Sequence, residues 1–370
     1  MTIYSIIEKA LERDPSDIHI SAGMVPYCRC AGRLVELDLP ATTEEETLAA
    51  AHQLLTQAQF AQLEAEGEVD VSLSVPDAVV TALEQDKPEE DQQPGTRLRL
   101  NVFRQRGSYA MAFRVLNKHI PSFEELGLPQ SQMEHFCTLT SGLVLVTGST
   151  GTGKTTTISA MVDWMNRNRA CHIITIEDPI EYFHEHQKAI VHQREIGRDT
   201  TSFGSALRSA LRQDPDVIFI GEMRDLESIS IALTAAETGH LVLSTLHTIG
   251  SAKTIDRIID VFPDSQQQQV RTQLSMVLQG ILSQQLLPSI DGRRRELATE
   301  LLMMTPAVRN LIRENRIPQI PNAILTGAAQ GMRSMDANLL QLVQQGRVHA
   351  EEARLYASAP DRFDELVRRG

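Results

Sequence analysis

Beyond residue 140 the chain carries four short runs of consecutive apolar residues, separated by segments with the spacing of amphipathic helices. Continuous apolar runs are typical of strands in a parallel sheet that helices cover on both faces. The predicted strands are LVLVT (143–147), HIITI (172–176), VIFI (217–220) and LVLST (241–245). The predicted helices span 155–166, 205–212, 226–237 and 265–287, and we expect the region 291–370 to be mainly helical.

The first part of the chain has a different pattern, in which strand-like and helix-like segments are short and mixed. Its predicted helices span 4–13 and 44–63, and its predicted strands span 18–21, 69–75, 96–103 and 108–116. Cys28 and Cys30 fit two alternate positions on one further strand. This mixture predicts a compact α+β domain.

A proline-bounded segment, HIPSFEELGLP (119–129), separates the two patterns. We therefore expect an N-terminal domain at 1–117, a linker at 118–130, the core of a second domain at 131–290 and a helical C-terminal region at 291–370. Within the first domain, EQDKPEEDQQPG (84–95) contains five acids and two prolines. Such a composition predicts a solvated surface loop, with an acidic docking loop for a partner as the alternative.

Composition narrows the classes of function. The 35 basic and 48 acidic residues give a formal net charge of −13, which argues against a general nucleic-acid or anionic-membrane binder. The four cysteines form no CxxC pair, so we expect no zinc site. The start, MTIYSIIEKALERD, lacks the features of a signal peptide, and no apolar run is long enough to span a membrane. We expect a soluble protein of a reducing compartment.

The clearest motif is GSTGTGKT (148–155), which matches the P-loop pattern G-x-x-x-x-G-K-[ST] and lies between a predicted strand and a predicted helix. Glycines let successive N–H groups of the backbone face a phosphate, and the helix N-terminus adds its positive end. Lys154 supplies a charge between the β- and γ-phosphates, and the Thr155 hydroxyl is a candidate Mg²⁺ ligand. The predicted ATP-binding residues are Gly148, Ser149, Thr150, Gly151, Thr152, Gly153, Lys154, Thr155 and Thr156.

Polar groups follow three of the predicted strands, at the edge where open parallel sheets bind ligands. HIITI leads into Glu177 and Glu181, VIFI into Glu222, and LVLST into His247. Each acid alone would more often be a solvated strand end, but their convergence on one P-loop favours catalysis. We expect Glu222 to activate the attacking water, because Gly221 allows the backbone a close approach to phosphate, and His247 to sense the γ-phosphate.

An ordered set of motifs resembles the secretion ATPase superfamily of type II and type IV systems, and within it the type IV pilus retraction ATPases. The motifs are SDIHISAG (16–23), RLRLNVFRQRG (97–107), the P-loop, TIEDPIEY (175–182), DPDVIFIGEMRD (214–225), ETGHLVLSTLHT (237–248) and TPAVRNLIRE (305–314). They are similar to the family's N-terminal signature, its strand pair before the linker, Walker A, Asp box, atypical Walker B, His box and the C-terminal segment associated with retraction.

The resemblance implies a fold, an assembly and partners. It implies a PAS-like N-terminal domain followed by a RecA-like ATPase domain, with ATP between them, in a hexameric ring. Arg99 and Arg114 fall on the positions of the family's arginine fingers. The alternative is that both are ordinary arginines on the exposed surface of a strand. The implied partners are an inner-membrane platform protein, the pilus base and related pilus ATPases. The implied location is cytoplasmic, held at the inner membrane through the pilus machine.

Two other functions are compatible with the sequence. A nucleotide-binding accessory ring subunit would bind ATP without turnover. A RecA-like nucleic-acid motor is disfavoured by the net charge and by the small supply of five Tyr and one Trp for base stacking. Assembly-type relatives normally carry a tetracysteine zinc element and extra N-terminal domains, which this sequence lacks, so we expect retraction rather than assembly.

Overall fold

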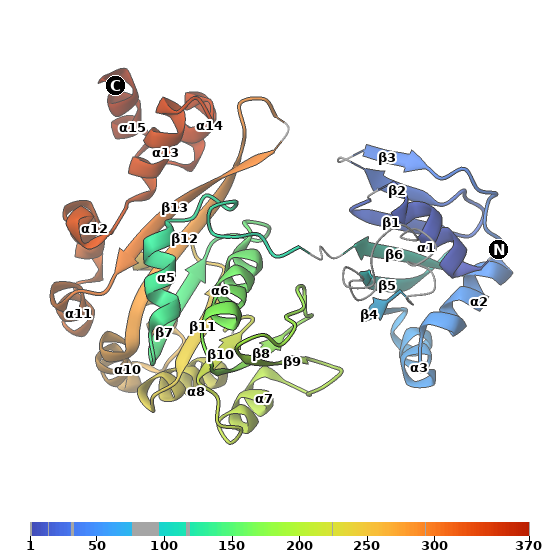
Figure 1. Cartoon of the computed structure of the whole chain (residues 1–370), viewed down its shortest axis with the longest axis horizontal. Coiled ribbons are helices and arrows are strands. Elements are labelled where there is room, and N and C mark those ends of the chain that lie inside the picture. Colours follow the sequence, from blue (N-terminus) through green and yellow to red (C-terminus); the bar gives the residue numbers. More distant parts are fainter. Residues whose placement is uncertain are drawn as a thin grey trace. The chain divides into compact units, whose positions relative to one another are not determined.

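The computed structural model describes residues 2–13, 15–30, 33–75, 96–115, 119–223, 225–292 and 294–369. The chain divides into two compact units, Met1–His119 and Ile120–Gly370, which are described separately (Figure 1). The acidic segment 84–95 and the first residue of the expected linker lie outside the described residues.

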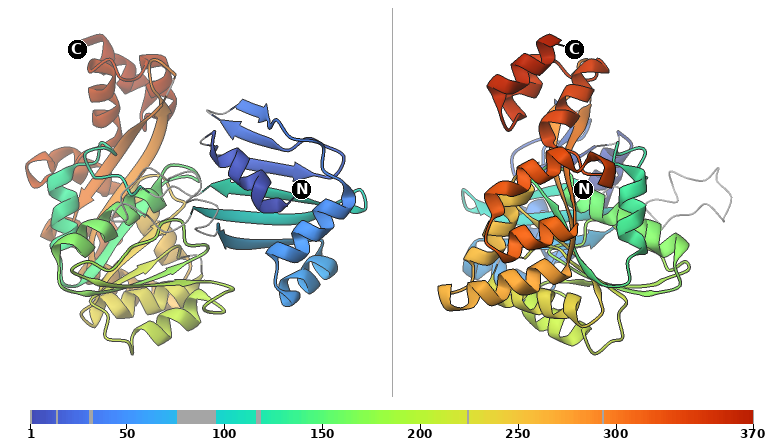
Figure 2. Two further views of the ribbon diagram at one scale, coloured as in Figure 1. Left: turned by 45° about the vertical axis from the view of Figure 1, so that its right-hand side comes forward. Right: turned by 90° about the vertical axis from the view of Figure 1, so that its left-hand side faces the viewer.

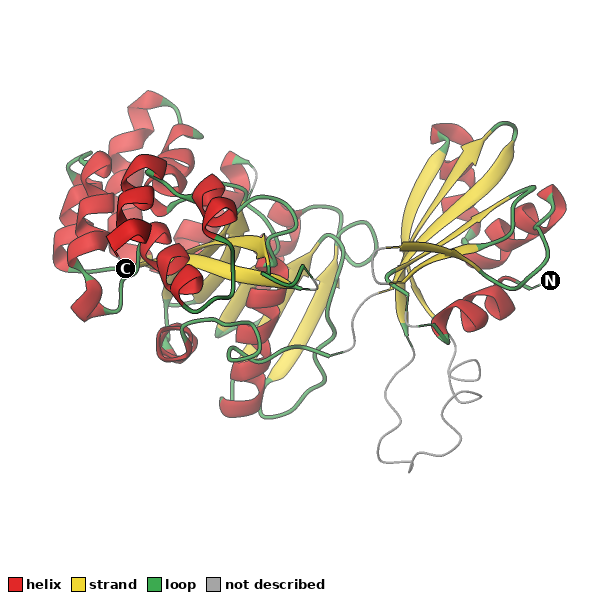
Figure 3. Ribbon diagram, turned by 90° about the horizontal axis from the view of Figure 1, so that it is seen from above, coloured by secondary structure: helices red, strands yellow, loops and turns green. Residues whose placement is uncertain are grey.

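The first unit is built on a six-stranded sheet in the order β3-β2-β1-β6-β5-β4, and all its strand pairs are antiparallel. Among the described residues of this unit, three helices pack against the sheet (Figure 3) and share a core with it that includes Ile7, Leu63 and Phe113. The expected α+β class is confirmed. The elements are α1 (Ile3–Leu11), β1 (Asp17–Ser21), β2 (Tyr27–Cys30), β3 (Arg33–Glu36), α2 (Glu44–Leu54), α3 (Gln57–Glu66), β4 (Glu68–Ser74), β5 (Arg97–Gln105) and β6 (Ser108–Val115).

The single helix expected at 44–63 is wrong, because the chain forms two helices there. Leu55 is extended, and Thr56 begins the second helix as its N-cap. The Thr56 hydroxyl accepts from the Gln59 N–H, while the Gln59 side chain accepts from the Thr56 N–H. This reciprocal capping box stabilises a new helix start that apolar spacing alone does not reveal.

The second unit contains a seven-stranded sheet in the order β13-β12-β7-β11-β10-β8-β9. Every neighbouring pair is parallel except β12 and β13, so the expected mainly parallel sheet is confirmed. Its edge strand β9 is absent from the sequence prediction. The strands are β7 (Gly142–Thr147), β8 (His172–Glu177), β9 (Ile190–Glu195), β10 (Val217–Ile220), β11 (Leu241–Leu246), β12 (Leu278–Pro288) and β13 (Arg295–Met303).

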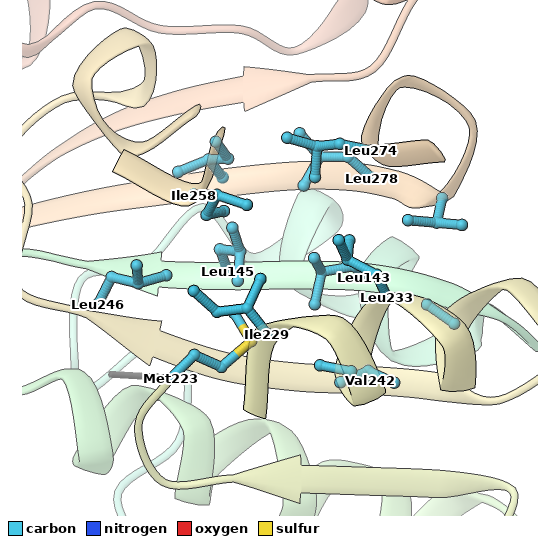
Figure 4. Close-up of a cluster of buried hydrophobic side chains, with 14 of the residues drawn as sticks. Leu143, Leu145, Met223, Ile229, Leu233, Val242, Leu246, Ile258, Leu274 and Leu278 are labelled. Atoms are coloured by element: carbon cyan, nitrogen blue, oxygen red, sulfur yellow. The ribbon is translucent and has the colours of Figure 1, made fainter. Parts of the chain in front are cut away.

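Helices cover both faces of this sheet. Leu143 and Leu145 of β7 belong to one buried cluster, shown in Figure 4, whereas Val144 and Val146 belong to another. The alternation follows from the period of two along a strand. The covering helices are α5 (Gln130–Thr138), α6 (Lys154–Asn168), α7 (Phe203–Ala210), α8 (Leu226–Glu237), α9 (Ser251–Asp260) and α10 (Asp264–Val277).

The long helix expected at 265–287 is also wrong. The helix α10 ends at Val277, and the chain continues as β12, which pairs in parallel with β7 and antiparallel with β13. Near the start of β12, Gly280 packs closely against Phe136. A Cβ at this position would lie 2.2 Å from Cζ of Phe136. Strand β13 likewise replaces part of the helical region expected beyond residue 290. Tertiary pairing overrides the helix-forming composition of both segments.

Beyond β13 the chain is helical, as expected. Helices α13, α14 and α15 lie at the end of the β12–β13 hairpin (Figures 1 and 2). They form a small core of their own with Leu287 of β12 and Ala298 of β13. The C-terminal elements are α11 (Pro306–Arg313), η2 (Ile317–Gln319), α12 (Ile320–Thr326), η3 (Ala328–Gln330), α13 (Met335–Gln344), α14 (Ala350–Tyr356) and α15 (Pro360–Arg369).

Candidate functional site

The P-loop connects β7 to α6, as its sequence context predicts. Gly148, Gly151 and Gly153 have φ of 147°, 79° and 82°, which side-chain-bearing residues rarely adopt. Gly148 is also required by space, because a Cβ there would lie 2.3 Å from the backbone oxygen of Gln284. The loop therefore has the curled backbone that turns consecutive N–H groups toward an anion, directly before the N-terminus of α6.

Lys154, the first residue of α6, is buried and folds back over the loop. Its Nζ donates to the carbonyl oxygens of Gly148 and Ser149, both at 2.9 Å. Burial lowers the pKa of Lys154, while the charges of Glu222 and Glu181 act in the opposite direction. The site thus holds a cation with acidic neighbours, at the position where a P-loop contacts phosphates.

His247 joins this lysine to an acid. Its Nδ1 lies 3.4 Å from Lys154 Nζ and 3.4 Å from Thr150 Oγ1, and its Nε2 lies 3.2 Å from Glu222 Oε1. An ammonium group only donates hydrogen bonds, so Nδ1 accepts and Nε2 carries the proton that faces Glu222. The structure therefore brings together Lys154, Thr150, Glu222 and His247, from three different segments of the chain.

Two hydroxyl groups of β11 fix the backbone next to Glu222. Ser244 Oγ donates to the carbonyl of Ile220 at 2.8 Å, and Thr245 Oγ1 donates to that of Gly221 at 2.6 Å. Sequence reasoning missed both residues. Their signal was available, since they are the two polar positions in the otherwise apolar run LVLST, and a buried hydroxyl needs a partner.

Glu177 occupies a different environment, buried at the end of β8 with 4% of its surface exposed. Its Oε1 accepts from Thr175 Oγ1 at 2.6 Å and from Gln193 Nε2 at 3.2 Å. Burial raises the pKa of Glu177 to about 7, the two hydrogen bonds lower it, and the charge of Glu181 raises it further. The carboxyl group can therefore exchange a proton near neutral pH.

The segment after β8 is held by residues that sequence reasoning missed. Gln193 of β9 donates to the Tyr182 carbonyl at 2.8 Å and accepts from the His184 N–H at 2.8 Å. The Tyr182 hydroxyl lies 3.2 Å from Thr156 Oγ1 and so links this segment to the first turn of α6. Gln193 had no sequence signal, because β9 itself was not predicted.

Thr152 and Thr155 complete the described contacts of the P-loop. Thr152 Oγ1 donates to the Ser149 carbonyl at 2.8 Å, and Thr155 is half-buried in the first turn of α6. Across the described residues, no three His, Cys, Asp or Glu side chains gather as a metal site. A Mg²⁺ ion here would depend on Thr155 together with phosphate oxygens, and a single hydroxyl at the start of the helix fits that arrangement.

Arg99 and Arg114 belong to the first unit. They are directly opposite each other on β5 and β6, and both are exposed. Arg99 Nε lies 3.9 Å from Asp70 Oδ1, and Arg114 Nε lies 3.1 Å from Asp17 Oδ1. The two arginines thus lie on paired strands, and each guanidinium has an acidic neighbour within its own unit.

Residues 95–355 match the family model described as Type II/IV secretion system protein. The chain belongs to this family. Its resemblance to the secretion ATPases is therefore confirmed. As a family member with a complete P-loop, the chain is an ATP-hydrolysing enzyme of the P-loop class.

Individual relatives extend this similarity to nearly the whole chain. It is 42% identical over 363 residues to the type IV pilus retraction ATPase PilT of Pseudomonas aeruginosa, covering 98% of this chain and 100% of that protein. It is 44% identical over 329 residues to a twitching motility protein of Neisseria gonorrhoeae, covering 89% and 83%. A crystal structure of the pilus retraction motor PilT with bound ADP superposes with a TM-score of 0.88 and 46% identity, covering 99% of each chain.

The described part of the chain contains no helix that is both long and apolar enough to cross a membrane.

Proposed function

We propose that this ATPase drives the retraction of a type IV pilus. The observation that supports ATP turnover is the chain of contacts from Lys154 through His247 to Glu222, which unites a phosphate-binding cation, a polar sensor and a base. Near-full-length similarity to proteins named for pilus retraction and twitching motility supports the choice of cargo.

In this proposal the P-loop residues 148–156 bind the phosphates of ATP, with Lys154 between the β- and γ-phosphates. Thr155 holds Mg²⁺, which when bound offsets the negative charge of the phosphates. Glu222 orients and activates the attacking water, and His247 registers the γ-phosphate through its contact with Glu222. Glu177 and Glu181 are the further acids of the nucleotide site, and Glu177 can also exchange a proton.

The active assembly is proposed to be a homohexamer in the cytoplasm, held at the inner membrane by the pilus machine. Arg99 and Arg114 would act there as cations that neutralise charge developing on the γ-phosphate. An inner-membrane platform protein and the pilus base are the proposed partners, with related pilus ATPases as further candidates. The net charge of −13 argues against nucleic acid as the cargo.

The test is a deletion strain complemented with the wild-type chain or with single variants. Lys154→Ala removes the phosphate-binding cation, whereas Lys188→Ala removes an exposed lysine of the same unit as a matched control. We expect the deletion and the Lys154→Ala strains to accumulate pili that do not retract, and the control to behave as wild type. Loss of pili from the deletion strain would instead assign the chain to pilus assembly. Normal pilus number and retraction in that strain would refute both roles.

A further inference from the structure

The β12–β13 hairpin lies against the P-loop on the side away from β11. Strand β7 has two neighbours in the sheet, and the Glu222–His247 pair lies on the β11 side. On the other side, Ser283 of β12 is in register with Thr147, the last residue of β7. The next residue of β12, Gln284, therefore lies beside the first residue of the P-loop, Gly148.

Three contacts join the hairpin to the loop. The Nε2 of Gln284 donates to the Thr152 carbonyl at 2.8 Å, and its backbone oxygen approaches Gly148 so closely that only glycine fits. From β13, Arg295 Nη1 donates to the Gly151 carbonyl at 3.2 Å. The beginning and the middle of the loop are thus positioned by one hairpin that contributes no residue to the predicted catalytic set.

Gln284 has the burial of a core residue but incomplete hydrogen bonding. Its exposed fraction is 1%, and its Oε1 finds no hydrogen-bond partner among the described residues. A buried amide with an unsatisfied oxygen does not favour folding. A glutamine at this position is better explained by the hydrogen bond that it donates to the loop.

The same hairpin carries the C-terminal helices. Gln285, the next residue along β12, donates from Nε2 to the Tyr356 carbonyl in α14 at 3.4 Å. The Thr299 N–H of β13 donates to Asn338 Oδ1 of α13 at 2.8 Å. Adjacent residues of a strand point to opposite faces, so one strand contacts the P-loop with one glutamine and the helical region with the next.

We propose that the β12–β13 hairpin couples occupancy of the P-loop to the packing of α13 and α14, with Gln284 as the positioning residue that makes the connection. The proposal rests on the proposed binding and hydrolysis of ATP and adds a route by which the nucleotide state reaches the C-terminal helices. Because packed elements move as units rather than deform, a shift of the Thr152 carbonyl on phosphate binding is passed to the hairpin.

Calorimetric titration with MgADP tests the first half of this proposal. Gln284→Leu keeps the volume and removes the donor, so the Kd for MgADP should rise about threefold to tenfold, the value of one hydrogen bond. Gln279→Leu is the matched control on the same strand, because the Gln279 side chain accepts from Arg309 Nη2 at 3.1 Å rather than contacting the loop, and it should bind as wild type. A merely structural role of Gln284 would lower the melting temperature and leave the Kd of the folded protein unchanged.

Hydrogen exchange of the full chain with and without saturating MgADP tests the second half. In the wild type we expect slower exchange in the P-loop and in α13 and α14, and in Gln284→Leu slower exchange in the P-loop alone. Unchanged exchange of α13 and α14 in the wild type, or wild-type affinity in Gln284→Leu, would overturn the coupling.

If Gln284→Leu does not fold, Arg295→Gln removes the exposed second contact and should weaken MgADP binding in the same way. Failure of the wild-type chain to bind MgADP would refute the ATPase proposal itself rather than the coupling.

Discussion

The Nε2–H of His247 faces Glu222 Oε1 at 3.2 Å, so the proposed water-activating carboxylate is held by the proposed γ-phosphate sensor. The opposite nitrogen of the same imidazole accepts from Lys154, which itself donates to the P-loop backbone. A movement of Lys154 is therefore transmitted to the Glu222 carboxylate through the imidazole ring of His247 alone.

Glu222→Gln removes the base and keeps an acceptor for His247. We expect kcat for ATP hydrolysis to fall about 10²-fold or more, because general-base catalysis contributes at least that much, while ADP affinity changes little. Steady-state ATPase assays and ADP titration measure the two effects. Glu227→Gln, at an exposed acid on α8, is the control. Hydrolysis at the wild-type rate by Glu222→Gln would show that another group activates the water.

Gly148→Ala tests whether the P-loop needs glycine for space as well as for its φ of 147°. A methyl group would lie 2.3 Å from the Gln284 carbonyl oxygen and 2.7 Å from Thr152 Oγ1. We expect loss of ADP binding and a free energy of unfolding lower by about 2–4 kcal/mol. Trp164, the one tryptophan of the chain, lies on α6 and reports urea unfolding of this unit by its fluorescence.

The matched control for Gly148→Ala is Gly197→Ala. Gly197 also has a positive φ, 83°, but a Cβ there would meet no atom within 4 Å. It should cost about 1–2 kcal/mol of stability, from backbone strain alone, and leave nucleotide binding intact. Equal losses in the two variants would mean that the close approach to β12 is unimportant.

Those parts of the fold and of the candidate site that depend on a local sequence pattern could be predicted from the sequence. The P-loop, the apolar strands and the groups that follow them could be predicted, because each depends on a local pattern with one physical solution. Gln284 could not, since its segment has the composition of a helix and becomes a strand only by pairing with β7. Gln193 was missed for the same reason, on a strand defined by its pairing with β8.

Glu177 gives a pH dependence of stability whose direction follows from its pKa. Burial raises this pKa from 4.5 to about 7, so between these values the folded chain retains a proton that the unfolded chain has lost. The contribution is favourable at low pH and is lost progressively as the pH rises from 4.5 to about 7, by roughly 3 kcal/mol in total. The contribution of Glu177 to the free energy of unfolding should therefore be smaller at pH 8 than at pH 5.

Glu177→Gln keeps the acceptor for Thr175 and Gln193 and removes the titration. Urea unfolding followed by Trp164 fluorescence at pH 5, 6, 7 and 8 should show that the variant gains stability over the wild type as the pH rises. Glu185→Gln, at an exposed acid nearby, should show no such gain. A constant difference between Glu177→Gln and the wild type across this range would mean that the carboxyl titrates at its ordinary pKa.

Arg99 and Arg114 are predicted to act on the γ-phosphate although they belong to the first unit. If they are catalytic fingers, Arg99→Ala and Arg114→Ala should each lower kcat by about 10³-fold, because such cations stabilise the charge of the transition state. Stability should change little, since exposed ion pairs such as those with Asp70 and Asp17 contribute at most about 1 kcal/mol.

Arg104→Ala is the matched control, as Arg104 is an exposed residue of the same strand β5 that pairs with Glu64 at 3.8 Å. ATPase assays on the assembled protein should separate the two positions from this control. If all three variants hydrolyse ATP equally well, Arg99 and Arg114 are surface strand arginines, and the charge of the γ-phosphate must be neutralised within the second unit.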